Sequence, residues 1–388
     1  MAQNPLRKKT AIVGVGTSDW GQLHWNPDPL RDKVSLGIEA LRAALDDAGL
    51  SINQIDGLVT SAVTDADNYP AFAYRAGLRS VRFLAPYPAS GRMCGVALAH
   101  AAMAVHAGLA NYVALVYSTT NRSVKNQFGG GQGGDLYDPV FGMTSPGAEY
   151  AMLYSRYVDR YGYRGRDELL GAVPIAFRKH AMLNPTAVMR DPLTLDAYLK
   201  ARYIARPLRL HDYCLICDGA TAYIVTSAER AKDLRKPPAY IASFAEHSTL
   251  WEMYVPPEPP EEYWYSYAQT MAKEVFERSG FAIKDVSVFQ VYDNFSPDVL
   301  WSLEGVGFCP RGEALRWIQG GRIELGGELP VNTSGGMLSE VYLQGWNLVA
   351  EAVRQLRGEC GARQVRNCNV VLYVCLAGVS SMVLLSSA

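Results

Sequence analysis

A glycine-containing loop ahead of a helix is the part of the sequence best suited to hold a reacting group. Residues 329–356, LPVNTSGGMLSEVYLQGWNLVAEAVRQL, read as a strand end, a loop with Ser334, Gly335 and Gly336, and an amphipathic helix. Free N–H groups and the positive end of the dipole at such a helix start favour an anion or an oxyanion. Histidine is the usual proton-transfer group beside such a loop. No histidine follows position 247, so we expect a different side chain to carry out the chemistry.

One helix-and-strand unit occurs twice in the chain. The segment 40–61, ALRAALDDAGLSINQIDGLVTS, aligns without gaps on the segment 271–292, MAKEVFERSGFAIKDVSVFQVY, and Gly49 then falls on Gly280. In each copy apolar residues recur at helical spacing, a glycine follows, and a β-rich run comes next. The repeat predicts that the chain is built from two related halves.

A second pair of elements repeats in the same order. Helix 91–108, followed by NYVALVYS, corresponds to helix 343–358, followed by NVVLYVC. Alternating helices and strands predict a mostly parallel sheet in each half, with helices against its faces. We therefore expect an α/β protein with one half at 1–235 and the other at 236–388. Their equivalent helix starts are expected to meet near a pseudo-twofold axis, where we place a site.

Residues from about 120 to 215 depart from this pattern and are expected to form an inserted lid or loop region. Five glycines occur among residues 129 to 134. They lack the Gly-Lys-Ser/Thr ending of a phosphate-binding loop, so we interpret them as flexible cover.

Composition narrows the classes of function. The 388 residues carry a formal net charge of -1 and no basic block, which argues against a nucleic-acid-binding protein. The N-terminal MAQNPLRKKTAIVGVG runs into a strand-like segment without a signal-peptide pattern, and the seven scattered cysteines are typical of reduced thiols. From these two features we expect a cytoplasmic protein. We also expect no metal site, because the CLIC segment at 214–217 has no second ligand pair. The C-terminal NVVLYVCLAGVSSMVLLSSA is expected to form two buried strands.

Four motifs follow one another along the chain: CDGATAYIVTSAERA at 217–231, VYDNFSP at 291–297, NTSGGMLSE at 332–340 and CLAG at 375–378. In this order they resemble the thiolase superfamily, in particular its sterol-carrier-protein-thiolase or lipid-transfer-protein branch. The resemblance covers nearly the whole chain. It implies a five-layered αβαβα thiolase fold from two duplicated halves, a dimer, and an acyl-CoA substrate.

The sequence departs from ordinary thiolases at their catalytic positions. In GRMCGVALAHAAMAVHAGLAN, Gly91 falls on the nucleophilic cysteine and Cys94 falls one helical turn later. Tyr342 and Tyr292 fall on two histidines, whereas Cys375 keeps a C-terminal thiol. This pattern is similar to the steroid side-chain aldolases of the same branch, which pair with a zinc-ribbon and OB-fold (DUF35) protein. Cys375 departs from that pattern, so thiolase activity stays an alternative function.

The resemblance also implies a role for each of these side chains. Free tyrosine, with a pKa of about 10, is a poor base, so we expect the helix start and the N–H groups of residues 334 to 336 to favour the Tyr342 phenolate. Tyr342 is then a general base or acid. Tyr292, at the carboxyl end of a strand, is a second acid or base or an oxyanion donor. Asn294 and the backbone of Gly378 are further donors to the substrate.

Three functions follow from this reading. The first is retro-aldol cleavage of a 3-hydroxyacyl-CoA with a bulky steroid-like or aryl acyl group, which needs no covalent nucleophile. The second is a thiolase (acyl-CoA C-acyltransferase) that cleaves a 3-oxoacyl-CoA with CoA, through a relocated thiol such as Cys94 or by direct attack of CoA, with Cys375 as base. The third is a non-catalytic acyl-CoA or lipid carrier that acts as scaffold for a DUF35 partner. In each case we expect no covalently bound cofactor, and CoA arrives as part of the substrate.

Overall fold

The computed structural model describes residues 4–63, 69–88, 93–125, 138–143, 145–248, 263–376 and 379–387. The first half consists of β1 (Thr10–Thr17), α1 (Trp20–Trp25), α2 (Lys33–Ala48), β2 (Gly57–Ser61), α3 (Tyr69–Ala76), β3 (Phe83–Tyr87), α4 (Met93–His106), β4 (Tyr112–Thr120), β7 (Asp218–Ser227) and α9 (Ala228–Ala231). The second half consists of β8 (Ala239–Ser248), α10 (Tyr263–Ser279), β9 (Val288–Val291), α11 (Ser296–Val306), α12 (Ala314–Trp317), α13 (Gly336–Ser339), α14 (Trp346–Arg357), β10 (Val370–Cys375) and β11 (Val379–Ser386).

The predicted repeat is confirmed. The pair α2 and β2 corresponds to α10 and β9, and the pair α4 and β4 corresponds to α14 and β10. Gly49 and Gly280 both follow their helix with φ of 73°, a left-handed conformation that glycine adopts without a Cβ clash. The same local sequence has therefore produced the same helix end in both halves.

Nine of the strands described by the structure form one sheet in the order β3-β2-β4-β7-β1-β8-β11-β10-β9, and two short strands of the insertion, β5 (Tyr203–Ala205) and β6 (Leu208–Arg209), pair separately. The halves join where β1 meets β8, at the pairs Ala11 with Tyr240 and Ile12 with Ala239. Parallel pairing is confined to β2 with β3 and β4, and to β9 with β10; the other neighbours are antiparallel. The expectation of mostly parallel sheets was therefore wrong. The short connection from β10 to β11 permits only antiparallel pairing.

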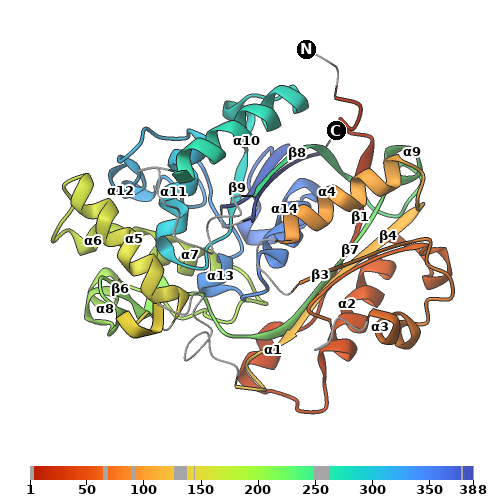
Figure 1. The fold of residues 1–388 in the computed structure, drawn as a ribbon, viewed down its shortest axis with the longest axis horizontal. Coiled ribbons are helices and arrows are strands. Elements are labelled where there is room, and N and C mark those ends of the chain that lie inside the picture. Colours follow the sequence, from red (N-terminus) through yellow and green to blue (C-terminus); the bar gives the residue numbers. More distant parts are fainter. Residues whose placement is uncertain are drawn as a thin grey trace.

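Five layers follow from the helix positions (Figure 1). The outer helix α2 shares a core with strands of the first half, and α10 and α11 share one with strands of the second half. The helices α4 and α14 lie between the halves, because their buried residues join a third core with strand residues from both. Gly16 lets α2 approach β1 closely, since a Cβ there would lie 2.0 Å from the Ala40 carbonyl oxygen.

The described part of the insertion is a helical layer over the second half (Figure 1). Tyr154 and Phe177 from the insertion share a hydrophobic core with Phe289 and Leu300. The glycine-rich run at 129–134 lies outside the described residues. The elements of the insertion are α5 (Pro146–Arg160), α6 (Asp167–Leu170), α7 (Ala172–Met182), α8 (Leu195–Lys200), β5 (Tyr203–Ala205) and β6 (Leu208–Arg209).

The C-terminal segment forms two buried strands, as predicted. The strands β10 and β11 pair antiparallel from Val370 with Ser386 to Cys375 with Ser381. Among the described helices, none combines the length and apolar character needed to cross a membrane.

Candidate active site

Two buried tyrosines from the second half lie at the centre of the candidate site. Tyr292 follows β9, where its backbone N–H donates to the Val374 carbonyl at 2.8 Å. Tyr342 lies in the segment between α13 and α14. Their hydroxyl oxygens are 3.2 Å apart, and the two residues are only 5% and 6% exposed. The structure thus brings together the two side chains that the motif comparison placed on catalytic histidines.

Both tyrosines are held in the neutral phenol form. Burial raises the pKa of Tyr292 well above its usual value, and the neighbouring Tyr342 and Cys375 raise it further. Burial likewise raises the pKa of Tyr342, with Cys214 as the next cause. The expectation that Tyr342 has a favoured phenolate was therefore wrong. Tyr342 lies four residues before Trp346, the first residue of α14, and is not at that helix start.

The glycine loop holds a protein carboxyl group at its helix start. The N–H groups of Met337 and Leu338 donate to the Asp293 carboxyl at 2.9 and 3.2 Å. Gly336 has φ of 60°, and a Cβ at this position would lie 2.3 Å from Asp293 Oδ2. The Gly335 N–H donates to the Asn332 carbonyl. We expected free N–H groups at residues 334 to 336, but the Gly335 N–H is occupied, and the next donors, at Met337 and Leu338, hold the loop beside Tyr292 through Asp293.

A buried polar network around Glu340 also holds the glycine loop. Ser334 Oγ donates to Glu340 Oε2 at 2.6 Å, and Asn347 Nδ2 donates to the same oxygen at 3.0 Å. Burial, reinforced by the nearby Glu351, raises the pKa of Glu340 to about 7. Glu340 was not among the residues selected from the sequence, although it begins the Glu-x-Tyr pattern that ends at Tyr342.

His180 from α7 also supports this loop. Its Nδ1 lies 3.2 Å from the Asn332 carbonyl oxygen, and its Nε2 lies 3.1 Å from the Leu325 backbone nitrogen. Burial lowers the pKa of His180 to about 4, so the ring is neutral, with Nδ1 as donor and Nε2 as acceptor. No sequence signal connected this histidine of the insertion with a loop about 150 residues away.

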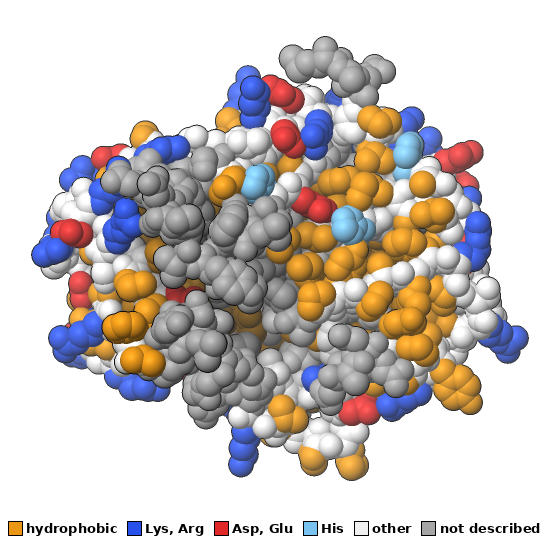
Figure 2. Space-filling view, viewed as in Figure 1, with side chains coloured by type: hydrophobic (Ala, Val, Ile, Leu, Met, Phe, Trp, Pro, Cys, Tyr) orange, Lys and Arg blue, Asp and Glu red, His pale blue; other side chains and the backbone are white. Residues whose placement is uncertain are grey.

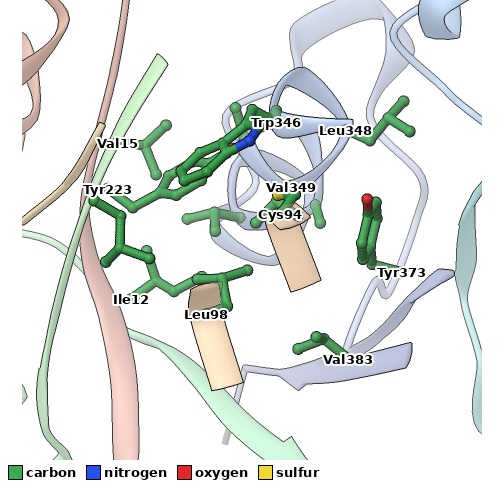
Figure 3. Close-up of a cluster of buried hydrophobic side chains, with 14 of the residues drawn as sticks. Ile12, Val15, Cys94, Leu98, Tyr223, Trp346, Leu348, Val349, Tyr373 and Val383 are labelled. Carbon is green, nitrogen blue, oxygen red and sulfur yellow. The ribbon is translucent and has the colours of Figure 1, made fainter. Parts of the chain in front are cut away.

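The two candidate thiols lie in the central layer. Cys375 ends β10 and is fully buried. Cys94, in the first turn of α4, lies among apolar side chains that include Val349 and Trp346 of α14 (Figure 3). Burial raises the pKa of Cys94 well above its usual value, and the nearby Cys375 adds to that shift. Cys94 is therefore a neutral thiol. Gly91 and Gly378, the other positions selected here, lie outside the described residues.

The CLIC segment at 214–217, which matched no metal-site pattern, lies between the loop that carries Tyr292 and the glycine loop. The Cys214 N–H donates to the Asn294 carbonyl at 2.9 Å, and the Leu215 N–H donates to the Met337 carbonyl at 3.1 Å. The segment therefore links the Tyr292 loop to the glycine loop. The amide oxygen of Asn294 is buried and has no hydrogen-bond partner among the described residues. Within those residues there is no group of three or more potential metal ligands.

Comparison with known proteins gives the family. Residues 260–385 match the thiolase C-terminal domain-like family. The chain is 37% identical over 370 residues to 17-hydroxy-3-oxo-4-pregnene-20-carboxyl-CoA lyase from Mycobacterium tuberculosis, which covers 91% of this chain and 92% of the relative. It is 36% identical over 362 residues to the steroid side-chain-cleaving aldolase of Thermomonospora curvata, with 90% of each chain covered.

A solved structure described as an Ltp2-ChsH2(DUF35) aldolase superposes with a TM-score of 0.87 at 34% identity, and covers 98% of both chains. The thiolase fold expected from the motifs is confirmed by this agreement together with the duplicated five-layered architecture. The chain therefore belongs to the thiolase superfamily, in the family of the steroid side-chain-cleaving aldolases.

Proposed function

We propose that the protein catalyses retro-aldol cleavage of a 3-hydroxyacyl-CoA whose acyl group carries a bulky ring system. The observation that carries this proposal is the contact between Tyr292 and Tyr342, with hydroxyl oxygens 3.2 Å apart in a buried site. The sequence has glycine, not cysteine, at position 91. Acyl transfer by the ordinary thiolase route needs a covalent nucleophile, whereas a retro-aldol reaction needs only an acid and a base. The names of the related lyase and aldolase support the same reaction class.

The tyrosine pair suits the proton balance of this reaction. In the reactive state one proton has left the pair, so Tyr342 is the phenolate and Tyr292 the phenol. Tyr342, as the general base, then takes the proton of the substrate hydroxyl while the carbon-carbon bond breaks and its electron pair moves into the thioester enolate. Tyr292, as the general acid, returns a proton to the α-carbon, which yields a short acyl-CoA and a ketone or aldehyde. The hydrogen bond between the two hydroxyls allows one proton to pass between them and restore the starting state. The reaction therefore neither consumes nor releases a proton overall.

The enolate oxygen needs hydrogen-bond donors. We assign this role to the side-chain amide of Asn294 and the backbone N–H of Gly378, with the loop of Ser334, Gly335 and Gly336 as a wall of the substrate site. The amide oxygen of Asn294 is buried and has no hydrogen-bond partner in the described part of the protein. The Nδ2 group of the same amide is the donor that we assign to the enolate.

We further propose that the protein works in the cytoplasm as a homodimer in complex with a DUF35 protein. The solved relative supports the partner, because its description names a DUF35 component. Hydrophobic side chains gather on the face where α4 and β3 lie (Figure 2). Leu84 of β3 and Met103 of α4 are 37% and 38% exposed. An apolar area of this kind supports a subunit contact. Sedimentation of the purified protein, alone and with the DUF35 partner, tests both associations.

A thiolase reaction remains the second candidate because two thiols lie together in the core. Cys94 and Cys375 are close enough for Cys375 to contribute to the raised pKa of Cys94. Both are fully buried, and no interaction that lowers the pKa of Cys94 outweighs its burial. A neutral buried thiol is a poor nucleophile, so we place this reaction below the aldolase.

Product analysis by mass spectrometry decides between these functions. The protein is co-expressed with the DUF35 partner and given a ring-bearing 3-hydroxyacyl-CoA or the matching 3-oxoacyl-CoA, each with and without free CoA. Cleavage of the hydroxy substrate without free CoA is the expected result. Cleavage of the oxo substrate alone, strictly dependent on CoA, would overturn the aldolase in favour of the thiolase. Turnover of neither substrate would favour a non-catalytic carrier.

A further inference from the structure

Tyr342 lies in a turn with an unfavourable backbone conformation. The turn runs from Glu340, which follows α13, to Asn347 in the first turn of α14. Gln344 and Gly345 within it have φ of 50° and 83°. The left-handed conformation is unfavourable for glutamine, so it persists only where other contacts hold the backbone. The position of Tyr342 therefore depends on the contacts that close this turn.

The Glu340 carboxyl group joins the two ends of the turn. Its Oε2 accepts hydrogen bonds from Asn347 Nδ2 at 3.0 Å and from Ser334 Oγ at 2.6 Å. Its Oε1 accepts a hydrogen bond from Asn184 Nδ2 at 3.0 Å. One side chain thus closes the turn and links it to the glycine loop and to the insertion.

The insertion also holds the backbone at the start of the turn. The Met189 N–H donates to the Ser339 carbonyl, and the Val188 N–H donates to the Glu340 carbonyl, both at 2.9 Å. The start of the turn is therefore fixed to the insertion, and the Glu340 carboxyl group connects that fixed point to α14.

The three donors around Glu340 require a carboxylate. Glu340 is 1% exposed, and Arg363, whose charge reaches it, is itself paired with Glu351 at 2.9 Å. A buried carboxylate without an adjacent cation is unfavourable. An ionised carboxyl group accepts hydrogen bonds at both oxygens, whereas the amide of a glutamine accepts at one end and donates at the other. A carboxylate at this position therefore satisfies donors on both sides, which an amide cannot do.

We propose that Glu340 is a positioning residue whose ionised carboxyl group closes the turn and so holds the Tyr342 hydroxyl in contact with Tyr292. It acts through Tyr342 and takes no part in proton transfer. Asn184 brings the insertion into the same role. This inference rests on the proposed aldolase function, in which the two tyrosine hydroxyls must stay within hydrogen-bond distance.

Glu340→Gln tests the proposal in the complex with the DUF35 partner. Whichever way the new amide is turned, its N–H groups face a donor, either Asn184 Nδ2 or Asn347 Nδ2. Misplacement of a reacting group by about 1 Å can cost about 100-fold in rate. We therefore expect kcat to fall about tenfold to 100-fold, with KM changed less than about twofold. Assays at about pH 8.5 keep the wild-type carboxyl group ionised, because burial raises the pKa of Glu340 to about 7.

A double variant exchanges the two groups that close the turn. In Glu340→Gln/Asn347→Asp, the new amide donates to the new carboxylate and to the Ser334 hydroxyl, and it still accepts from Asn184. Asn347→Asp alone places two carboxylates in contact and is expected to lower kcat as Glu340→Gln does. The double variant is expected to have a kcat at least about fivefold above that of either single variant. A double variant no more active than Glu340→Gln would overturn the proposal.

Glu304→Gln is the matched control, because Glu304 of α11 is also 1% exposed. Both the Tyr157 hydroxyl and the Ala314 N–H donate to its Oε1, at 2.5 and 2.9 Å, and an amide oxygen can replace this acceptor. The control is expected to keep wild-type kcat. Melting temperatures of Glu340→Gln and Glu304→Gln are expected to lie within a few degrees of the wild type. Equal kcat in Glu340→Gln and the wild type, or equal losses in both glutamine variants, would overturn the positioning role.

A second measurement does not depend on turnover and so separates failure of this inference from failure of the aldolase proposal. The ¹³Cζ signals of Tyr342 and Tyr292 are recorded by NMR on ¹³C-labelled tyrosine and assigned with Tyr342→Phe. We expect Glu340→Gln to shift both signals, the double variant to move them back, and Glu304→Gln to leave them unchanged. Unchanged signals in Glu340→Gln would refute the positioning role, even if kcat were lowered. Shifted and restored signals in a protein that cleaves no 3-hydroxyacyl-CoA would support the positioning role and remove the aldolase.

Discussion

Replacing Tyr342 by phenylalanine tests the central assignment with the smallest possible change. The substitution removes one hydroxyl and keeps the ring that packs in the central core. General acid or base catalysis by one side chain contributes about 10²- to 10⁴-fold to a rate. Tyr342→Phe is therefore expected to lower kcat/KM by that factor, which corresponds to about 3 to 5 kcal/mol of lost transition-state stabilisation.

The expected effect on stability is much smaller. The hydroxyl of Tyr342 makes a 3.2 Å hydrogen bond to the hydroxyl of Tyr292. Loss of one such bond, which leaves a buried partner behind, costs about 1 to 3 kcal/mol. In a chain of 388 residues this loss shifts the melting temperature by only a few degrees. The variant therefore stays folded at the assay temperature, and the lost activity reports on chemistry.

The assay is the release of short acyl-CoA from a 3-hydroxyacyl-CoA by the complex with the DUF35 partner. Tyr163→Phe is the matched control, because Tyr163 is also buried and donates its hydroxyl to the Gly312 carbonyl at 2.8 Å, away from the site. It is expected to lose similar stability and to keep full activity. Near-normal turnover by Tyr342→Phe would refute the assignment of Tyr342 as general base.

Three further predictions concern the loop that holds the tyrosine pair. Burial raises the pKa of Glu340 from 4.5 to about 7, so the free energy of unfolding falls as the pH rises through this range. In Glu340→Gln, chemical denaturation between pH 5 and pH 8 should show a smaller fall. His180 has its pKa lowered from 6.5 to about 4, so stability falls as the pH drops through that range, and denaturation of His180→Asn should show a smaller fall. Gly336→Ala places a Cβ 2.3 Å from Asp293 Oδ2 at φ of 60° and should lower both the melting temperature and kcat, whereas alanine at Gly358, with open space around it, should leave kcat unchanged.

The sequence was sufficient to predict the repeat because its signals are local. Helix periodicity, the glycine after each helix and the apolar runs that form strands are all decided within a few residues of one another. Strand direction is decided by which distant strands become neighbours, so the mostly parallel sheet was predicted wrongly. The pairing of β1 with β8, which joins the halves, likewise has no local signal.

In the candidate site, too, local motifs could be predicted from the sequence and contacts between distant residues could not. Tyr292 and Tyr342 were found because each lies inside a recognisable motif, and the structure places their hydroxyls in contact. Asp293 was passed over although it is adjacent to Tyr292, because nothing in a linear sequence shows that its carboxyl meets the backbone of Met337. The pKa of Tyr342 was predicted in the wrong direction for the same reason. From sequence alone a helix start is read as a set of free donors, because only the fold shows which residue occupies them.

The way the site is built explains why a thiolase fold suits proton transfer between phenols. A thiolase-type site depends on charged intermediates near a nucleophile, and here burial keeps Cys94, Tyr292 and Tyr342 neutral. A neutral phenol is a good hydrogen-bond donor to a developing enolate, and it becomes a base only when its proton is taken away. The apolar surroundings that weaken thiol chemistry therefore strengthen acid chemistry by the tyrosine pair.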